Sequence, residues 1–346
     1  MSTVLAGIDE AGYGPTLGPL AVGLAVLEVT GVEGAEGGVP DLWRSLEAGV
    51  CREAGRGGTR DRQGRVAIAD SKRLKLPNSS GAAHPLVNLE RGVLSMLAAM
   101  GDGGHSPTTD DELFAMLGGS LPAHIAYSGP ALALPIGNPP GEIAISANVV
   151  RKACVGAGVR VLAMRCRMIG EGQFNAIIER TRNKSETTAL AVGEHLRAVI
   201  RGFSAGEQPD RPRQRLGIVC DRLGGRTSYD RMLSRELPGM SVTTVDETEE
   251  RSRYVVTDGA GSRAGVSFMV EGEKHHMAVA LASMIAKYCR ELAMIRFNRF
   301  FAVQHRDLTG IEIRPTAGYA LDARRWLSEI GETLTARDRD ELVRRA

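Results

Sequence analysis

Strand-like and helical segments alternate along this 346-residue chain, and this alternation limits the possible fold more than any other feature of the sequence. Short runs rich in Val, Leu and Ile, bounded by Gly or Pro, predict strands. Longer runs with apolar residues three or four positions apart predict helices. Strands interleaved with helices are typical of layered α/β and α+β folds. We therefore expect an α/β domain with a mixed central sheet flanked by helices.

The predicted strands lie at residues 3–8, 19–29, 159–169, 215–225, 241–247 and 266–273. The predicted helices lie at residues 41–50, 70–77 with Asp70 as N-cap, 85–99, 174–200 with a break near Asn183, 275–300 and 320–330, followed by a charged closing helix. The helix at 275–300 is the clearest, and its small apolar residues suit close packing against a sheet.

Two stretches do not follow the strand–helix pattern. Residues 30–66 are Gly-rich and charged, and residues 101–148 are interrupted by many Gly and Pro residues. We interpret both as insertions into one catalytic domain that spans residues 1–335. Residues 336–346 are expected to form a charged tail or the end of a helix.

Composition excludes several classes of protein. The net charge is only +2, whereas strong nucleic-acid binders are often much more basic, so any nucleic-acid site must be local. The five cysteines are scattered and form no CxxC pair, which favours reduced thiols in the cytoplasm. The opening residues lack the pattern of a signal peptide, and no long apolar run predicts a membrane span.

Acidic residues stand at the predicted ends of strands. Asp9 and Glu10 lie in "GIDEAGYGP", Asp221 ends another strand, and Glu273 lies between a strand and the long helix. Clustered carboxylates raise one another's pKa, and divalent cations relieve this repulsion. Oxygen ligands favour Mg²⁺ or Mn²⁺, and two such ions can cleave a phosphodiester. A single acid at a strand end is more commonly a turn residue or a helix cap, so that alternative stays open.

Asp9 and Glu10 are adjacent, so a regular strand would point them to opposite faces of the sheet. We therefore expect the strand to end or bulge at this pair if both carboxylates serve one site. The glycine turn that follows at residues 12–14 favours such a special geometry.

Five segments together resemble the type 2 ribonuclease H family, which includes ribonucleases HII and HIII. They occur in the order found in that family: "GIDEAGYGPTLGPLAVG", "ADSKRLKL", "IVCDRLGG", "EGEKHHMAVALASMIAKYCRE" and "TAGYALDARRWL". The matches run from residue 7 to about residue 330 and leave residues 30–66 and 101–148 unmatched.

The resemblance implies a ribonuclease H-like fold and a role for each matching residue. It implies that the backbone of a glycine loop reads the ribonucleotide 2′-hydroxyl, which distinguishes RNA from DNA. It also implies a tyrosine that stacks on the sugar and contacts to phosphate. The implied metal-binding catalytic residues are Asp9, Glu10, Asp221 and Glu273, and the implied substrate-binding residues are Gly12, Tyr13, Gly14, Ser71, Lys72 and Tyr319.

Three features depart from the family pattern. Tyr13 stands where ribonuclease HII usually has Arg. Glu273 stands where the HII branch usually has Asp, as the HIII branch prefers. The first motif begins at residue 7, so the extra N-terminal domain typical of HIII is not seen in this sequence. The chain therefore resembles a divergent member of the family.

Other polar residues have simpler interpretations. The adjacent His275 and His276 lack the i, i+4 spacing of a zinc pair, so we expect a solvated or capping element. Residues 246–254 are interpreted as a solvated acidic loop. Lys184 is compatible with either a nucleic-acid contact or a helix break. Surface charge is the interpretation of Arg324, Arg325 and the closing "RRA".

The leading hypothesis is a monomeric endoribonuclease that uses two Mg²⁺ or Mn²⁺ ions. It would cut the RNA strand of RNA–DNA hybrids, or ribonucleotides embedded in duplex DNA, leaving 5′-phosphate and 3′-hydroxyl ends. The alternative is a catalytically silent protein that binds the same hybrids. A magnesium-dependent phosphotransferase is disfavoured because no GxxxxGK[ST] motif is present.

Overall fold

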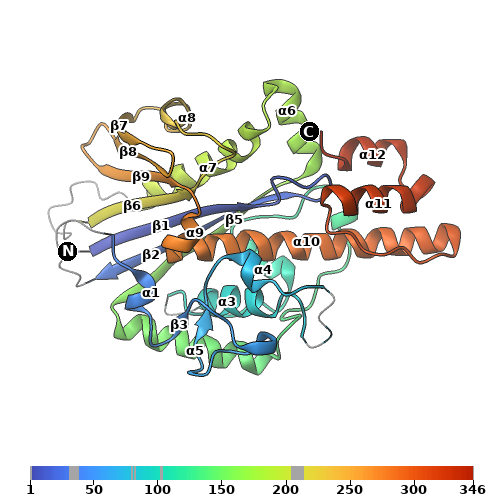
Figure 1. The fold of residues 1–346 in the computed structure, drawn as a ribbon, viewed down its shortest axis with the longest axis horizontal. Helices are drawn as coiled ribbons and strands as arrows, with labels where there is room; N and C mark the ends of the chain where they lie inside the picture. Colours follow the sequence, from blue (N-terminus) through green and yellow to red (C-terminus); the bar gives the residue numbers. More distant parts are fainter. Residues whose placement is uncertain are drawn as a thin grey trace.

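A seven-stranded mixed sheet forms the centre of the molecule, and helices cover both of its faces (Figure 1). The computed structural model describes residues 2–30, 39–78, 81, 83–101, 104–203 and 214–345. The predicted fold class is confirmed. The strands lie in the spatial order β5 (Val159–Ile169), β2 (Leu20–Thr30), β1 (Ser2–Ala11), β6 (Gln214–Asp221), β9 (Arg263–Met269), β8 (Arg251–Thr257) and β7 (Ser241–Glu247).

The direction of the strands brings acidic residues to one edge of the sheet. β1 and β6 are parallel, as are β6 and β9, and the other neighbours are antiparallel. The register pairs Ile8 with Cys220, so the residues that follow, Asp9 and Asp221, lie at the same level on adjacent strands. A separate parallel pair joins β3 (Val50–Cys51) and β4 (Val66–Ala67).

Two apolar layers hold the helices on the sheet. Leu5 on β1 faces the layer beneath α10, whereas its neighbours Val4 and Ala6 face the layer beneath α7 and α8. In Figure 1, α10 crosses one face of the sheet, and α6, α7 and α8 cover the other. The helices are α1 (Leu42–Ser45), α2 (Ser71–Leu74), α3 (Val87–Ala98), α4 (Asp110–Met116), α5 (Pro140–Gly156), α6 (Glu171–Thr181), α7 (Ser185–Phe203), α8 (Asp230–Glu236), α9 (Gly272–His275), α10 (Met277–Thr309), α11 (Ala320–Ile330) and α12 (Ala336–Leu342), with 3-10 turns η2 (Arg56–Gly58), η3 (Ile125–Tyr127) and η4 (Gly331–Thr333).

Glycines let α10 lie directly on the sheet. A Cβ at Gly7 would stand 2.1 Å from the Ala278 carbonyl carbon, and one at Gly23 would stand 2.1 Å from the Ala282 carbonyl oxygen. Both distances are shorter than any real contact, so only glycine fits at these positions. The expected close packing of this helix is confirmed.

Several predicted elements differ from the structure. The strand predicted at 215–225 ends at Asp221, and the helix predicted at 41–50 is limited to Leu42–Ser45. Residues 246–254 are not a loop, because β7 continues to Glu247 and β8 begins at Arg251; Ser252 and Tyr254 on β8 are buried. The strand predicted at 266–273 ends at Met269. The long helix begins at residue 277 rather than 275 and continues to 309, since the turn α9 precedes it.

The two stretches interpreted as insertions contain ordered elements. Residues 39–66 include α1 and β3, and the described part of 101–148 includes α4 and the start of α5. Residues 31–38 and 102–103 lie outside the described residues, as does most of the polar loop predicted at 204–214. The domain boundary at residue 335 stays a prediction.

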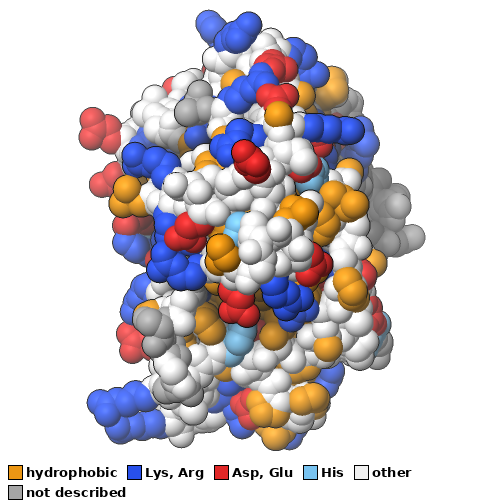
Figure 2. Space-filling view, turned by 90° about the vertical axis from the view of Figure 1, so that its right-hand side faces the viewer, with side chains coloured by type: hydrophobic (Ala, Val, Ile, Leu, Met, Phe, Trp, Pro, Cys, Tyr) orange, Lys and Arg blue, Asp and Glu red, His pale blue; other side chains and the backbone are white. Residues whose placement is uncertain are grey.

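One face of the molecule shows no separation of charges by sign. On the face shown in Figure 2, basic and acidic side chains lie side by side, with small apolar areas between them. All five cysteines are buried and unpaired. Among the described residues, no helix has both the length and the apolar character that a membrane crossing requires.

Candidate active site

One pocket of about 250 Å³ collects every site residue that the sequence predicts. It lies at the edge of the sheet where β1 and β6 end, beneath the start of α10. The roles of these residues remain predictions, but the expected convergence is present. The lining residues are Asp9, Glu10, Ala11, Gly12, Tyr13, Gly14, Pro15, Ser71, Lys72, Asp221, Glu273, Ser283, Lys287 and Tyr319.

The pocket receives both adjacent acids of β1 without a bulge. β1 pairs with β2 in unbroken register through Ala11, so the expected end or bulge at Asp9 and Glu10 is wrong. Pairing with β6 stops at Ile8, which leaves this edge of β1 open beyond it. Because the pocket opens at the edge of the strand, side chains from both faces reach it.

The other two acids come from the ends of β6 and α9. The Asp221 Oδ1 accepts a hydrogen bond from the Gly272 N–H at 3.0 Å. Glu271 adopts the left-handed conformation, with φ of 53°, and this turn carries the chain from β9 into α9. Glu273 on α9 is buried, and its Oε2 atom has no hydrogen-bond partner.

Burial and mutual repulsion disfavour the ionised form of these acids. The pKa of Asp9 is raised well above its ordinary value by burial and by repulsion from Glu10 and Asp221. The pKa of Glu10 is raised to about 8, mainly by burial and then by Asp221, although Lys72 lowers it. Burial also raises the pKa values of Asp221 and Glu273. A cation in the pocket would offset this cost.

The candidate ligands are of the chemical type that a hard divalent cation prefers, but their side chains do not surround a site for one. Every candidate ligand is a carboxylate, and the orphaned Glu273 Oε2 is available for coordination. Within the described residues, however, no group of three or more His, Cys, Asp or Glu side chains is spaced to hold an ion. Backbone amides occupy one oxygen of Asp9 and one of Asp221, from Glu10 N and Gly272 N respectively.

A glycine turn forms one wall of the pocket. Gly12 has φ of 90°, and a Cβ there would lie 2.5 Å from Arg290 Nε, so a side chain is excluded. Gly14 faces open space. Between them, the half-buried Tyr13 ring lies 5.3 Å from Lys184 Nζ, which places Lys184 beside the turn.

Ser71, Lys72 and residues of α10 also line the pocket. Asp70 caps α2 as predicted, because its carboxylate accepts from the Lys72 N–H. Ser71 is buried, and its hydroxyl lies 3.0 Å from that of Ser283, whereas Lys72 is exposed. Lys72 is therefore better placed than Ser71 to meet a phosphate.

Two lining residues of α10 were not predicted. Ser283 and Lys287 stand four positions apart, so they share one face of the helix. The sequence "ASMIAK" shows this spacing, but only the structure shows that both residues line the same pocket as the carboxylates. Tyr319 is 45% exposed rather than a core residue, and Lys287 Nζ lies 5.6 Å from its ring.

The remaining sequence candidates lie outside the pocket. His276 precedes α10 without a side-chain cap bond, and His275 is exposed. Asn183 marks the break between α6 and α7, where its side chain accepts from the Ser185 N–H. Surface charge is the wrong interpretation for Arg344, which is buried, whereas Arg345 is exposed as expected.

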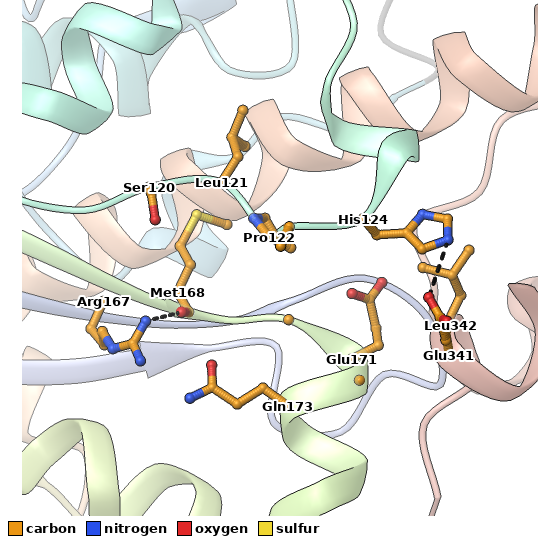
Figure 3. Close-up of a pocket in the computed structure, with 13 residues that line it drawn as sticks. Ser120, Leu121, Pro122, His124, Arg167, Met168, Glu171, Gln173, Glu341 and Leu342 are labelled. Atoms are coloured by element: carbon orange, nitrogen blue, oxygen red, sulfur yellow. Dashed lines mark hydrogen bonds and ion pairs between the residues drawn. The ribbon is translucent and has the colours of Figure 1, made fainter.

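A second cavity, of about 380 Å³, lies where the loop at 120–124 meets the start of α6 and the end of α12 (Figure 3). Its charged side chains already have partners. His124 lies between Asp338 and Glu341, at 3.2 and 3.8 Å, and Arg167 donates to the Met168 carbonyl. We therefore interpret this cavity as part of the interface where α12 packs on the domain, and not as a catalytic site.

Comparison with known proteins yields similarities of fold only. No protein-family model matches the chain, and no curated protein matches its sequence. Similar solved structures include ribonuclease HII of Archaeoglobus fulgidus in its complex with PCNA (14% identity, TM-score 0.39), which covers 99% of this chain and 93% of that one. The ribonuclease H2 of Pyrococcus horikoshii has 14% identity and a TM-score of 0.39, covering 94% and 86%.

A variant of Bst-RNase HIII has 15% identity and a TM-score of 0.42, covering 99% of this chain and 64% of that one. These structures bear the names of the family that the sequence motifs resemble. At such scores the likeness assigns no activity, so the function is argued from the pocket.

Proposed function

We propose that this protein is a divalent-metal-dependent endoribonuclease that cuts the RNA strand of RNA–DNA hybrids or ribonucleotides embedded in duplex DNA. The observation that carries the proposal is the single pocket in which four acids from three distant segments meet a glycine turn, two lysines and an exposed tyrosine. We take it to act as a monomer in the cytoplasm.

Each part of the pocket has a task in this reaction. The carboxylates of Asp9, Glu10, Asp221 and Glu273 would hold divalent ions, which supply an activated water and stabilise the departing 3′-oxygen. The backbone of the glycine turn would contact the ribose 2′-hydroxyl, and the Tyr319 ring would stack on the sugar. Lys72 and Lys287 would attract the phosphate.

A matched pair of glutamates provides the test. Glu273→Gln removes a pocket carboxylate, whereas Glu271→Gln changes an exposed glutamate two residues away that pairs with Lys274. With a labelled hybrid and Mn²⁺ or Mg²⁺, we expect Glu273→Gln to lower the cleavage rate by roughly 100-fold and Glu271→Gln to leave it nearly unchanged. The products should carry 5′-phosphates. Equal rates for the two variants would remove Glu273 from the site.

A hybrid-binding protein without catalysis is the second candidate. It is favoured by one observation, the spacing of the acids, since no described group of three is close enough to hold an ion. Titration with Mn²⁺ separates the two candidates without any cleavage assay. An enzyme should gain thermal stability as the ion binds, and Asp9→Asn should abolish the gain, whereas a silent binder should show tight hybrid binding and no such gain.

A further inference from the structure

A buried arginine far along the sequence lies directly behind the glycine turn. Arg344 is only 5% exposed, and its Nη1 donates to the Gly12 carbonyl at 2.5 Å. Its own N–H donates to the Thr16 carbonyl at 2.9 Å. One residue therefore contacts the chain at Gly12, in the turn, and at Thr16, just beyond it, although 332 positions separate it from Gly12.

The segment that carries Arg344 is fixed independently of the turn. The Asn175 amide on α6 donates to the Val343 carbonyl at 3.0 Å, and its oxygen accepts from the Arg345 N–H at 2.8 Å. The Arg344 guanidinium lies 4.4 Å from the centre of the Phe174 ring, which is also on α6. The segment that carries the arginine is thus anchored on α6.

The geometry of the peptide group determines which way the Tyr13 N–H points. Peptide groups are planar and trans, so the Gly12 carbonyl and the Tyr13 N–H point in opposite directions. Arg344 does not line the pocket, whereas Gly12 and Tyr13 do. Fixing the carbonyl from behind therefore aims the Tyr13 N–H to the other side of the turn.

Burying this arginine is costly, and the cost is not fully offset. Arg344 Nε and Nη2 are buried without hydrogen-bond partners, and burial lowers the pKa of the guanidinium to about 10. Attraction to Glu171 offsets part of this cost, but apolar replacements of buried charges are often as stable, so the retained charge is consistent with a role beyond stability.

We propose that Arg344 is a positioning residue that holds the turn at residues 12–14 so that its backbone can read the ribose 2′-hydroxyl. The proposal rests on the proposed function and specifies how that site discriminates RNA from DNA.

Three variants and a control test the proposal. Arg344→Met removes the donors, Arg344→Lys keeps the charge and one donor group, and Asn175→Ala releases the segment without altering the arginine. Arg345→Gln is the control, because Arg345 is 44% exposed and pairs with Asp340 and Glu179.

Amide hydrogen exchange of residues 12–18 is the first measurement, and it needs no substrate. Arg344→Met and Asn175→Ala should exchange faster there, while β1 and α10 keep their protection and Arg345→Gln behaves as wild type. Unchanged exchange in both variants would overturn the proposal. If Arg344→Met does not fold, Asn175→Ala and Arg344→Lys give the answer.

Discrimination between hybrid and DNA is the second measurement, made with Ca²⁺ and without turnover. Arg344→Met should bind the hybrid more weakly while binding to an all-DNA duplex stays the same. In a separate cleavage assay with Mg²⁺ or Mn²⁺, its kcat/KM should fall by roughly 100-fold. Arg344→Lys should restore part of the preference, and Arg344→Met combined with Asn175→Ala should be no worse than either alone. Equal weakening for both duplexes would indicate a merely structural role and overturn the proposal. If wild type shows no preference, the proposed function fails, while hydrogen exchange still decides whether Arg344 holds the turn.

Discussion

His195 on α7 is a buried side chain that connects a helix to the central sheet. It is 5% exposed, and its Nε2 lies 3.0 Å from the Val22 carbonyl oxygen on β2. Burial, together with repulsion from Arg165 and Arg167, lowers its pKa to about 4. The folded protein therefore holds this imidazole neutral, with Nε2–H as the donor.

Acid should destabilise the protein through this residue. A histidine whose pKa falls from about 6.5 to about 4 on folding contributes fully above pH 6.5, and the contribution is lost as the pH falls toward 4. Between pH 7 and pH 5 the loss is about 2 kcal/mol. We expect urea unfolding to show this loss in wild type and a smaller one in His195→Gln, whose amide can donate to the same carbonyl without titrating. Parallel pH dependence in the two proteins would contradict the assignment.

At the scale of elements, an ion pair locks the stretch 101–148 onto α10. Asp110 at the start of α4 is fully buried, and both of its oxygens accept from Arg296 on α10. Arg296 also donates to the Gly129 carbonyl at 2.8 Å, and Asp110 accepts from the Leu132 N–H. The stretch is therefore part of the folded body and not a loose addition.

Removing one partner should be costly. Asp110→Asn leaves the Arg296 charge buried beside a weaker acceptor, so we expect a loss of about 3–5 kcal/mol of unfolding free energy. Asp111 pairs with the same guanidinium but is 59% exposed, so Asp111→Asn should cost less than about 1 kcal/mol. Chemical denaturation of the two variants measures the difference, and equal losses would show that burial of the pair is unimportant.

The sequence predicts those elements whose signals are local. Residues 159–169, 241–247 and 320–330 are correctly placed to the residue, because their apolar periodicity is strong. The strand at 251–257 is missed because acidic neighbours mask the alternation of Ser252, Tyr254 and Val256. The order in 101–148 depends on Arg296, nearly two hundred positions away, and no local pattern reveals such a partner.

The candidate site divides in the same way, because some of its residues are visible in local sequence patterns and others are not. The acids at strand ends are visible in the sequence, and the family resemblance supplies the glycine turn and Tyr319. Arg344 and Arg345 are indistinguishable as letters, yet one is buried behind the turn and the other is exposed. The backbone contacts with Asn175 fix the path of the chain, and this path buries Arg344 and exposes Arg345.

At the scale of the molecule, the separation of α10 from the sheet determines the shape of the pocket. Gly23→Ala would place a methyl group 2.1 Å from the Ala282 carbonyl oxygen, next to Ser283 in the pocket wall. We expect a loss of about 1–3 kcal/mol in stability, together with slower cleavage of the hybrid. Gly217→Ala on β6 is the control, because its Cβ would meet only Leu5 Cδ2 at 3.6 Å. If both variants behave alike, close packing of α10 has no special importance.

The glycines of β1 and β2 thus connect the packing of α10 on the sheet to the shape of the candidate active site. Ser283 and Lys287 reach the pocket because the helix that carries them lies on bare backbone. Gly7 and Gly23 carry a hydrogen atom where other residues carry a Cβ, so α10 lies close to the sheet. This separation determines the depth of the pocket. Under the proposed function, substitutions that never touch a substrate should therefore tune which nucleic acids are accepted, by changing the thickness of one layer.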